Sequence, residues 1–486
     1  MANTPNTPSL LYNKMHERFV LCEALMGGTV EMRRQGEVFL PQFAKETDSR
    51  YQKRRDNSVL FDAYRNTIQT LSGKPFGTPV QLKEGSPVLF EDIAKDVDLT
   101  GTDLTTFSRQ LLEDLLVYGK CHFIVDYPDT NRLAAELARS LTKADEKRQR
   151  LRPYFIRLKP SQLIGWQGSR FAGIETLQGI RFRESTYEKS AEAWTEVQVD
   201  RVIHWQPDVI ESYKYASEGT GEWVLDGPAQ ENTLEEVPLV TVYANRSALL
   251  TAFPPLEGLA HLNQKHWRNQ SDQDQIETVN RVPILTLLGF ADNEVGSVEI
   301  GPYKVISNKS GNARVEIVET SGKAVEVGQK GIDRVENQMQ AMSLQPLIRR
   351  AGNPTATELS IEAGREVSDL EAYVMLLEKG LDAGFAMSAR WTGEALDTAG
   401  TKISQDFGPL PTDKDFEHLG KDLDRGVITR GRYLFERQRR GLYSDDMDIA
   451  DELDAVDEEG SAETQDDVDR MRQEEERLAA EEAAAA

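Results

Sequence analysis

The sequence of 486 residues is poor in cysteine and lacks any long apolar run. Cys22 and Cys121 are its only cysteines, and two thiols so far apart suggest neither a disulfide scaffold nor a zinc site. The longest apolar stretches, residues 249–253 and 282–290, are far shorter than the roughly 20 residues that span a membrane. The first residues lack the basic and apolar regions of a signal peptide. We expect a soluble, non-secreted protein that is synthesised in the cytoplasm and has no membrane segment.

Positive charge is also scarce. The sequence has 57 Lys and Arg against 81 Asp and Glu, a net charge of −24 at pH 7. A protein whose whole surface grips nucleic acid needs a basic footprint, so this class is excluded. The negative charge is unevenly distributed along the chain. Residues 445–486 hold 18 acids and three bases, a net charge of −15, which leaves a net charge of −9 for residues 1–444. The end of the chain is acidic and almost free of aromatics, which predicts a disordered tail or a lone helix over residues 446–486.

Motifs that carry enzyme chemistry are missing as well. The sequence contains no G-x-x-x-x-G-K-[ST] phosphate loop, no G-x-S-x-G nucleophile elbow and no H-E-x-x-H zinc motif. His261 and His266 are five residues apart, on different faces of a helix, so we expect interface or hydrated histidines rather than metal ligands. Cys121 and His122 are neighbours on a strand and point to opposite faces. We therefore predict a protein that is not an enzyme and needs no metal or cofactor.

The spacing of apolar residues changes along the first half of the chain. Residues 11–72 and 103–116 show helical spacing, and the apolar run at 121–127 predicts a strand. Between residues 153 and 245 the period is two, with Gly, Pro, Asn or Asp between the segments, which predicts an antiparallel meander. Helices followed by such a meander predict an α+β fold.

A basic cluster precedes the predicted helix at residues 61–71. It consists of Arg50, Lys53, Arg54 and Arg55. Two interpretations are open at this point: a solvated start of a helix, or a basic spot that contacts nucleic acid.

The second half of the chain begins with an unusual helix. Residues 256–281 contain no proline and look helical, yet they are polar on every side after Trp267. Such a helix has no core to face, so it bridges solvent, is unstable, or packs against other chains. The predicted elements that follow are strands within 282–320, a helix at about 330–347, a short loop, a long helix at 358–395, a short strand at 402–407 and a helical pair at 413–440, divided near 426–429.

The long helix carries a nearly heptad row of apolar residues. Its members are Ala363, Val367, Leu370, Val374, Leu377, Leu381 and Phe385. Spacings of three and four residues put them on one side, so we expect this helix to pack lengthwise on another helix.

This order of parts resembles the portal proteins of tailed bacteriophages. Several stretches are similar to the portal subfamily known as a domain of unknown function in double-stranded DNA phages. They are YRNT at 64–67, LSGKPF at 71–76, YGK at 118–120, FIVDYP at 123–128, PPLEGLAHLN at 254–263 with SD at 271–272, and PTATE at 354–358. The resemblance extends over residues 50–445.

The resemblance implies a division of the chain into the parts of a portal subunit. These parts are a wing at 1–250, a first stem helix at 251–282, a β clip at 283–326, a second stem helix at 327–347, a tunnel loop at 348–357, a long wing helix at 358–400, a helical crown at 401–445 and a disordered acidic tail at 446–486.

The resemblance also implies a function and partners. Similar proteins form homo-oligomeric, twelvefold rings at the portal vertex of the capsid, after synthesis in the host cytoplasm. They conduct double-stranded DNA during packaging and ejection without reading its sequence. Their partners are the terminase large subunit, the major capsid and scaffolding proteins, and later a head-completion adaptor or tail proteins. The alternatives are another head–tail connector or minor capsid protein and, disfavoured by the missing motifs, a DNA-processing enzyme.

Two groups of candidate residues follow from the implied parts. The tunnel loop would hold Arg349, Arg350, Asn353 and Thr355 near the DNA; the two arginines either complement a helix dipole or contact phosphate transiently. The clip would hold Phe290, Asp292, Tyr303 and Lys304 at the surface that docks the motor or adaptor. Phe290 and Tyr303 either contact that partner or pack in a core. A mildly acidic body suits a channel, because it repels phosphate and lets DNA slide.

Overall fold

The computed structural model has the predicted α+β class. It describes residues 4–128, 130, 142, 145, 148–189, 194–216, 222–281, 284–288, 314–318, 322–342, 356–393, 400–405, 413–439, 443 and 447–456. The chain divides into two compact units, Met1–Gln405 (unit 1) and Asp406–Ala486 (unit 2). Each unit is described by itself below.

Unit 1 begins with a group of helices. The side chain of Ser9 caps the first of them by accepting a hydrogen bond from the Tyr12 backbone N–H at 3.1 Å. Asp103 caps the last in the same way, and that helix ends at Gly119, whose φ of 76° favours glycine. The elements are α1 (Leu10–Met26), α2 (Gly28–Gln35), η1 (Gly36–Val38), α3 (Asp48–Asn57), α4 (Ala63–Gly73), η2 (Lys74–Phe76), α5 (Val88–Lys95) and α6 (Leu104–Tyr118).

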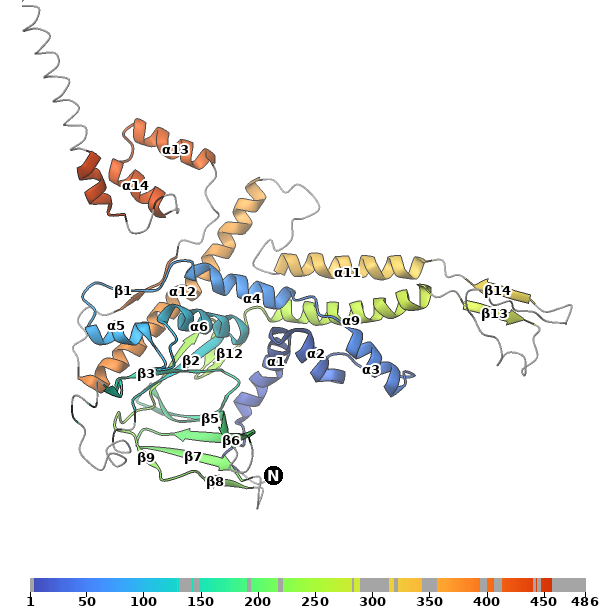
Figure 1. Ribbon diagram of the computed structural model, residues 1–486, viewed down its shortest axis with the longest axis horizontal. Helices are drawn as coiled ribbons and strands as arrows, with labels where there is room; N and C mark the ends of the chain where they lie inside the picture. The colour runs from blue at the N-terminus through green and yellow to red at the C-terminus, as the bar shows by residue number, and fades with distance from the viewer. Residues whose placement is uncertain are drawn as a thin grey trace, which may run out of the picture. The chain divides into compact units, whose positions relative to one another are not determined.

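A three-stranded antiparallel sheet forms the centre of unit 1. Its order is β10 (Leu239–Tyr243), β2 (Lys120–Asp126) and β3 (Tyr154–Leu158), so the strand predicted at 121–127 is the middle one. β2 is buried at every residue except its last. Phe107 of α6 packs against Phe123 and Phe155 of this sheet, with ring centroids 5.8 and 6.0 Å apart. The main core of unit 1 therefore lies between the sheet and the helices that cover it (Figure 1).

A larger sheet holds most of the predicted meander. Its strands are β4 (Leu163–Phe171), β5 (Ile174–Lys189), β6 (Glu196–Trp205), β7 (Val209–Tyr215) and β8 (Trp223–Leu225) in sequence order, and β9 (Gln230–Glu231) pairs with β7. The predicted single meander is wrong at its two ends, where β3 and β10 pair with β2 instead. The reason is that β2 is buried, so the backbone N–H and C=O groups along both of its edges need partner strands.

The apolar row predicted that the long helix α12 (Ala356–Thr392) packs lengthwise on another helix. In the structure α12 packs mainly on the central sheet. Its row members Leu370, Val374, Leu377, Leu381 and Phe385 are buried, whereas the side chains of Ala363 and Val367 lie outside the described ones. Gly380 and Gly384 allow close approach, since a Cβ at either would collide with Val242 of β10 or Phe123 of β2. α12 also contacts α6.

Two short pairs complete unit 1. β1 (Gln81–Leu82) pairs with β15 (Thr401–Lys402), which overlaps the strand predicted at 402–407 only at Lys402, and β11 (Arg246–Ala248) pairs with β12 (Thr251–Ala252). Asp382 of α12 accepts hydrogen bonds from the backbone N–H and the hydroxyl of Thr401 at 2.6 and 2.9 Å. The chain that follows α12 is thereby tied back to it.

Unit 2 contains the predicted helical pair, α13 (Asp413–Asp424) and α14 (Arg430–Arg439), with Gly426 at φ 69° between them. Residues 449–456 form a further helix, which is one of the two alternatives predicted for the tail. This helix is not a lone one, because Met447 just before it and Leu453 within it contact α14. Residues 457–486 lie outside the described residues.

Candidate functional site: the arm of α9 and α11

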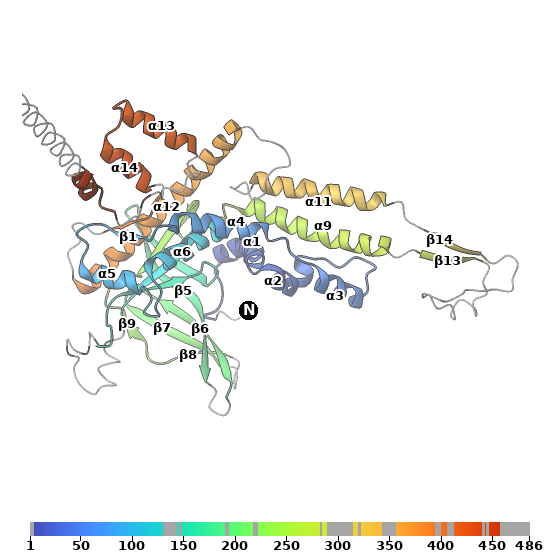
Figure 2. The ribbon, with the colours of Figure 1, turned by 45° about the horizontal axis from the view of Figure 1, so that its top comes forward.

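Unit 1 carries a pair of helices with a β-hairpin beyond their ends. We call α9 (Glu257–Arg281), β13 (Ile284–Leu288), β14 (Arg314–Val318) and α11 (Lys323–Met342) the arm. α9 and α11 lie side by side in both ribbon views, and β13 pairs with β14 in antiparallel register from Ile284↔Val318 to Leu288↔Arg314 (Figures 1 and 2). With 25 residues, α9 is about 37 Å long.

The helix predicted at 256–281 is present as α9, but the second predicted helix starts earlier in the structure than predicted. α11 begins at Lys323, directly after Gly322 with φ 67°, rather than at about residue 330. The last residues of the segment expected as the clip, 323–326, are therefore helical. Residues 343–347, expected to end the second helix, lie outside the described residues.

Apolar and small residues of α11 face α9. Ile332, Val335 and Met339 follow each other at spacings of three and four and are buried. Gly328 allows close approach, because a Cβ there would collide with the Gln273 side chain of α9. α11 is thus an amphipathic helix with one row against α9.

Four polar residues of α9 are buried inside the same chain, which corrects the expectation of a helix with no core to face. The exposed fractions are 0% for Asn263, 3% for His266, 1% for Ser271 and 2% for Gln273. Buried polar groups are costly unless they are hydrogen-bonded, so each needs a partner. A count of apolar spacing could not have found them, because they are polar residues at core positions.

One side of α9 is bound to the helical group at the start of unit 1. Asn263 accepts a hydrogen bond from the Tyr64 backbone N–H at 2.9 Å and donates one to the Phe61 carbonyl at 2.8 Å. Ser271 accepts a hydrogen bond from the Ser58 hydroxyl at 2.9 Å. Further along, Arg268 Nε donates to the Phe39 carbonyl at 2.9 Å. These contacts fix α9 at several points along its length.

The other side of α9 is bound to α11. His266 Nε2 lies 3.0 Å from Glu336 Oε1, and its ring lies 5.1 Å from the Phe61 ring. Gln273 donates from its amide to the Val325 carbonyl at 3.1 Å. His266 is thus an interface histidine, as predicted, whereas His261 is exposed beside Glu257 at 3.8 Å.

Arg54 of the predicted basic cluster is buried, so neither of the two interpretations holds for it. Its side chain is 2% exposed, and two guanidinium nitrogens donate to the two Glu46 carboxylate oxygens at 2.9 and 2.8 Å. The guanidinium also lies 4.3 Å from the Phe43 ring centroid and 4.0 Å from Asp272 of α9. The hydrogen bonds from Arg54 hold the pKa of Glu46 below its usual range. The pair therefore links the segment before α3 to α9.

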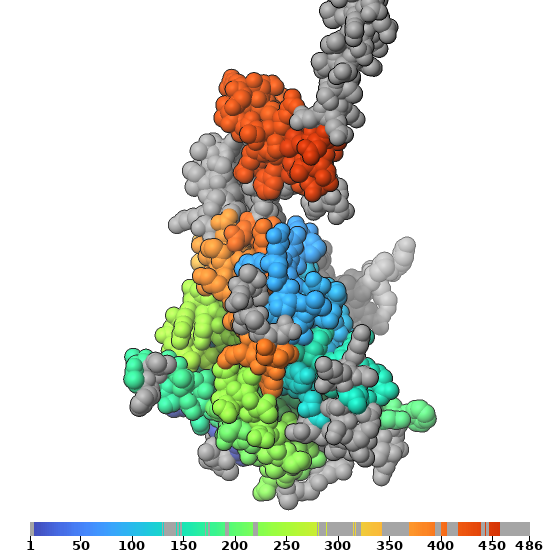
Figure 3. All heavy atoms as spheres, turned by 90° about the vertical axis from the view of Figure 1, so that its left-hand side faces the viewer, coloured from blue at the N-terminus to red at the C-terminus, as the bar shows by residue number. Residues whose placement is uncertain are grey.

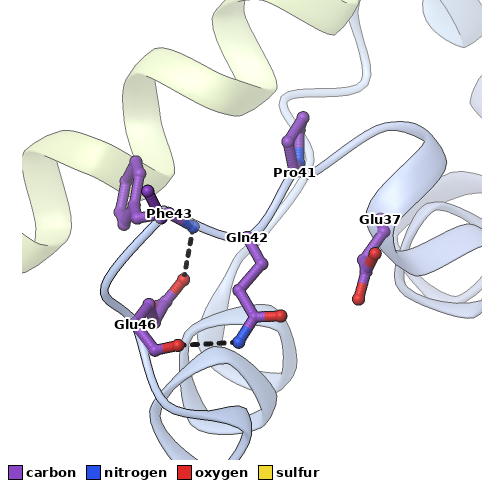
Figure 4. A pocket seen from close by; sticks show the side chains of 6 residues that line it. Glu37, Pro41, Gln42, Phe43 and Glu46 are labelled. Atoms are coloured by element: carbon purple, nitrogen blue, oxygen red, sulfur yellow. Dashed lines mark hydrogen bonds between the residues drawn. The ribbon is translucent and has the colours of Figure 1, made fainter.

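A shallow hollow of about 440 Å³ lies beside this ion pair, lined by Glu37, Pro41, Gln42, Phe43, Ala44 and Glu46. Figure 4 shows Phe43 in front of the α9 ribbon and Glu46 on the loop below it, with Gln42 donating to the Glu46 carbonyl at 2.8 Å. The Phe43 backbone N–H donates to the Glu46 carboxylate at 3.2 Å. These hydrogen bonds close the loop on itself and shape it around the Arg54 guanidinium.

The charge of the two arm helices is almost balanced. Residues 257–281 and 323–342 together hold seven Asp and Glu against six Lys and Arg. Such a surface offers phosphate neither a basic track nor strong repulsion.

All eight predicted site residues lie outside the described residues. This holds for Arg349, Arg350, Asn353 and Thr355 of the expected tunnel loop and for Phe290, Asp292, Tyr303 and Lys304 of the expected clip. Their placement stays a prediction. Within the described ranges, no group of three or more His, Cys, Asp or Glu is arranged to hold a metal ion. Nor does that part of the chain contain a helix long and apolar enough to cross a membrane.

Residues 255–392 match the family described as Domain of unknown function (DUF4055). The match begins just before α9 and ends with α12, so it contains the whole arm. No curated protein matches the chain.

Three solved structures are among those similar to this chain, each at a low TM-score. The neck of an empty GTA particle computed with C6 symmetry has TM-score 0.43 and 10% identity, over 85% of this chain and 93% of that one. The virion of a native gene transfer agent (GTA) particle has TM-score 0.41 and 10% identity, over 84% and 92%. The neck of a native GTA particle computed with C12 symmetry has TM-score 0.41 and 9% identity, over 83% and 91%.

Proposed function

We propose that the chain is a portal subunit of a phage-like particle, which assembles as a ring around a channel for double-stranded DNA. The observation that carries the proposal is the arm: two paired helices with a β-hairpin beyond their ends, followed by the long helix α12 (Figure 2). This is the order that the resemblance implies for stem, clip, stem and wing helix. The matched family segment, residues 255–392, covers these same elements.

In this proposal α9 and α11 are the stem helices and line the channel. Their near-balanced charge suits that position, because many arginine contacts would hold the DNA backbone and slow its passage. The hydrogen bonds that Asn263 and Ser271 accept from the Tyr64 N–H and the Ser58 hydroxyl are directional, and they hold α9 at one angle on the body. A ring needs such rigidity, since every subunit must present the same surface to its neighbour.

The proposal gives the remaining parts their roles. The hairpin end, with Phe290, Asp292, Tyr303 and Lys304 nearby in the sequence, docks the terminase large subunit during packaging and then a head-completion adaptor or tail protein. Arg349, Arg350, Asn353 and Thr355, between α11 and α12, contact the passing DNA. Contacts with the major capsid and scaffolding proteins would place the ring at one capsid vertex. The chain itself performs no catalysis; the terminase supplies the energy.

Negative-stain microscopy and sedimentation of the purified full chain test this function. We expect a closed ring with a central hole wide enough for a DNA duplex, of one sedimenting mass. A chain that stays monomeric over the whole accessible concentration range, without a channel, contradicts the portal role. A ring without a through-going hole would favour a different connector or minor capsid protein.

A further inference from the structure

Unit 2 separates opposite charges into neighbouring segments. Residues 425–440 hold six arginines and one acid, Glu436, in a chain with net charge −24. The next segment, residues 445–486, holds 18 acids and three bases. Charge blocks of opposite sign, so close in sequence, attract each other within about one Debye length, roughly 10 Å at 0.1 M salt.

The arginines of α14 lie in two rows. Residues seven apart are two helical turns and about 10.5 Å apart on the same side of a helix. Three rows of this kind follow one another around α14 at steps of about 100°: Arg430 with Arg437, Gly431 with Gln438, and Arg432 with Arg439. The two arginine rows therefore lie on opposite sides of the helix, and the row between them has no charge.

The acidic helix at 449–456 lies against this middle row. Gln438 Nε2 donates to the Met447 carbonyl at 2.7 Å, and Leu453 Cδ1 lies 3.4 Å from the position of a Cβ on Gly431. The side chain of Asp448 caps the helix by accepting from the Ala450 backbone N–H at 2.8 Å. The described helices of unit 2, orange to dark red in Figure 3, form one packed body. The exposed acids of this segment are Asp448, Asp451, Glu452 and Asp454.

Aromatic rings hold two of the arginines in place. The Arg437 guanidinium lies 4.9 Å from the Tyr433 ring centroid and 5.8 Å from that of Tyr443. Arg432 lies 5.3 Å from the Phe435 ring centroid, pairs with Glu436 at 2.7 Å, and is 57% exposed in its side chain. Guanidinium groups that are stacked on rings keep their planar N–H donors for phosphate oxygens. Because the rings already contact arginines, they favour recognition of a DNA backbone over stacking on unpaired bases.

We propose that α14 is a binding site for the phosphate backbone of double-stranded DNA, and that the acidic residues of segment 448–456 compete with DNA for it. The acidic helix occupies the strip between the arginine rows and acts as an internal polyanion. Its contacts with α14 through Leu453 and Met447 leave its carboxylates at the surface, where they lower the local attraction for phosphate. The choice of DNA among polyanions rests on the proposed function; the site itself does not.

The test compares three variants of the full chain in binding a fluorescent duplex of about 30 base pairs at about 0.1 M salt. The first neutralises the helix with D448N, D451N, E452Q and D454N. The second adds R425Q, R430Q and R432Q to the first. The third is a control that removes the same number of charges from exposed carboxylates of unit 1, with E91Q, E184Q, E196Q and E231Q. Circular dichroism confirms that all variants are folded.

We expect the first variant to bind the duplex roughly tenfold more tightly than the wild type, and the control to change binding by less than about twofold. The second variant should lose the gain, and its slope of log K against log salt should fall by about one for each arginine removed. Binding by the first variant that equals the wild type or the control overturns the proposal. So does a gain that survives the loss of the three arginines.

These results are separate from the test of the portal role. If the protein forms a ring but shows no arginine-dependent gain in DNA binding, the α14 site is contradicted and the portal role is not. A monomer that shows the gain removes the portal role and leaves the site standing.

Discussion

Two long helices of unit 1, α9 and α12, are attached to the body in different ways. α12 buries a row of apolar side chains against the central sheet and α6. α9 also buries apolar side chains, Leu259 and Trp267. In addition it buries polar residues such as Asn263 and Ser271, which are fixed by hydrogen bonds to backbone and side-chain groups. Apolar burial stabilises without specifying direction, whereas hydrogen bonds are directional. The difference suits an arm that must hold one angle and a helix that must hold the body together.

The same contrast extends to buried charge. Next to α9, the Arg54 guanidinium meets the Glu46 carboxylate, so charge is balanced by charge. In the core beside β2, the Lys120 ammonium donates to the Leu250 carbonyl at 2.6 Å and lies 5.3 Å from the Trp166 ring centroid. Burial lowers the pKa of Lys120 to about 7. The first arrangement should tolerate changes of pH that the second does not.

The largest effect is expected from the apolar attachment of α12. Phe385 is 1% exposed and packs on Phe90 and Phe155, with ring centroids 4.8 and 5.5 Å apart. Phe385→Ala should lower the free energy of unfolding by about 3–5 kcal/mol, measured by urea denaturation. Met375→Ala, at an exposed position of the same helix, should change it by less than about 0.5 kcal/mol. Equal effects at the two positions would show that the buried row does not hold α12.

The ion pair beside α9 comes next. Arg54→Met removes the guanidinium and leaves the Glu46 carboxylate, whose side chain is 8% exposed, without its charged partner. We expect a loss of about 3 kcal/mol, because an uncompensated buried charge is costly. The neighbouring Arg55→Met, at a half-exposed residue paired with Asp56, is the matched control and should cost less than about 1 kcal/mol. A similar small loss from both variants would contradict the role given to Arg54.

A single amide tests the directional attachment of α9. Asn263→Ala removes the partner of the buried Tyr64 N–H and one of the two hydrogen bonds to the Phe61 carbonyl, and should cost about 1–3 kcal/mol. Lys265→Ala, exposed on the same helix, is the control. Hydrogen exchange of the α9 backbone amides should be faster in Asn263→Ala than in the wild type. In Lys265→Ala it should be unchanged. If α9 kept its protection in both, the hydrogen bonds would not be what fixes it.

The smallest effect concerns Lys120. Its pKa is lowered in the folded state, so the folded protein releases a proton that the unfolded chain keeps, and stability rises with pH above about 7. Between pH 7 and 8 we expect a gain of about 1 kcal/mol from this group. Lys120→Met should remove the gain, and Lys14→Met, at an exposed lysine, should keep it. A pH dependence that is the same in all three proteins would mean that Lys120 stays protonated.

The sequence predicted what depends on local spacing. The helix at 257–281, the buried row of α12, the strand β2 and the helical pair of unit 2 were all foreseen from periodicity and from Gly and Pro positions. Pairings between strands distant in sequence were not predicted, since no local pattern indicates that β3 and β10 are the neighbours of β2. The polar core of α9 was missed for a different reason. Asn263 and Ser271 are recognisable as core residues only once their partners, 199 and 213 residues away, are in place.

Arg54 shows the same limit for charge. In sequence it is one of four basic residues within six positions, and only the loop that brings Glu46 and Phe43 to it separates it from the others. The candidate residues on either side of α11 were carried by resemblance alone, and the structure describes none of them.

Reconstruction of the assembled particle by electron microscopy tests the portal role most directly. We expect a ring in which α9 and α11 of every subunit line the channel, with the β13–β14 hairpin at one end of it. Arms that point away from the ring axis, or a particle without a channel, would contradict it.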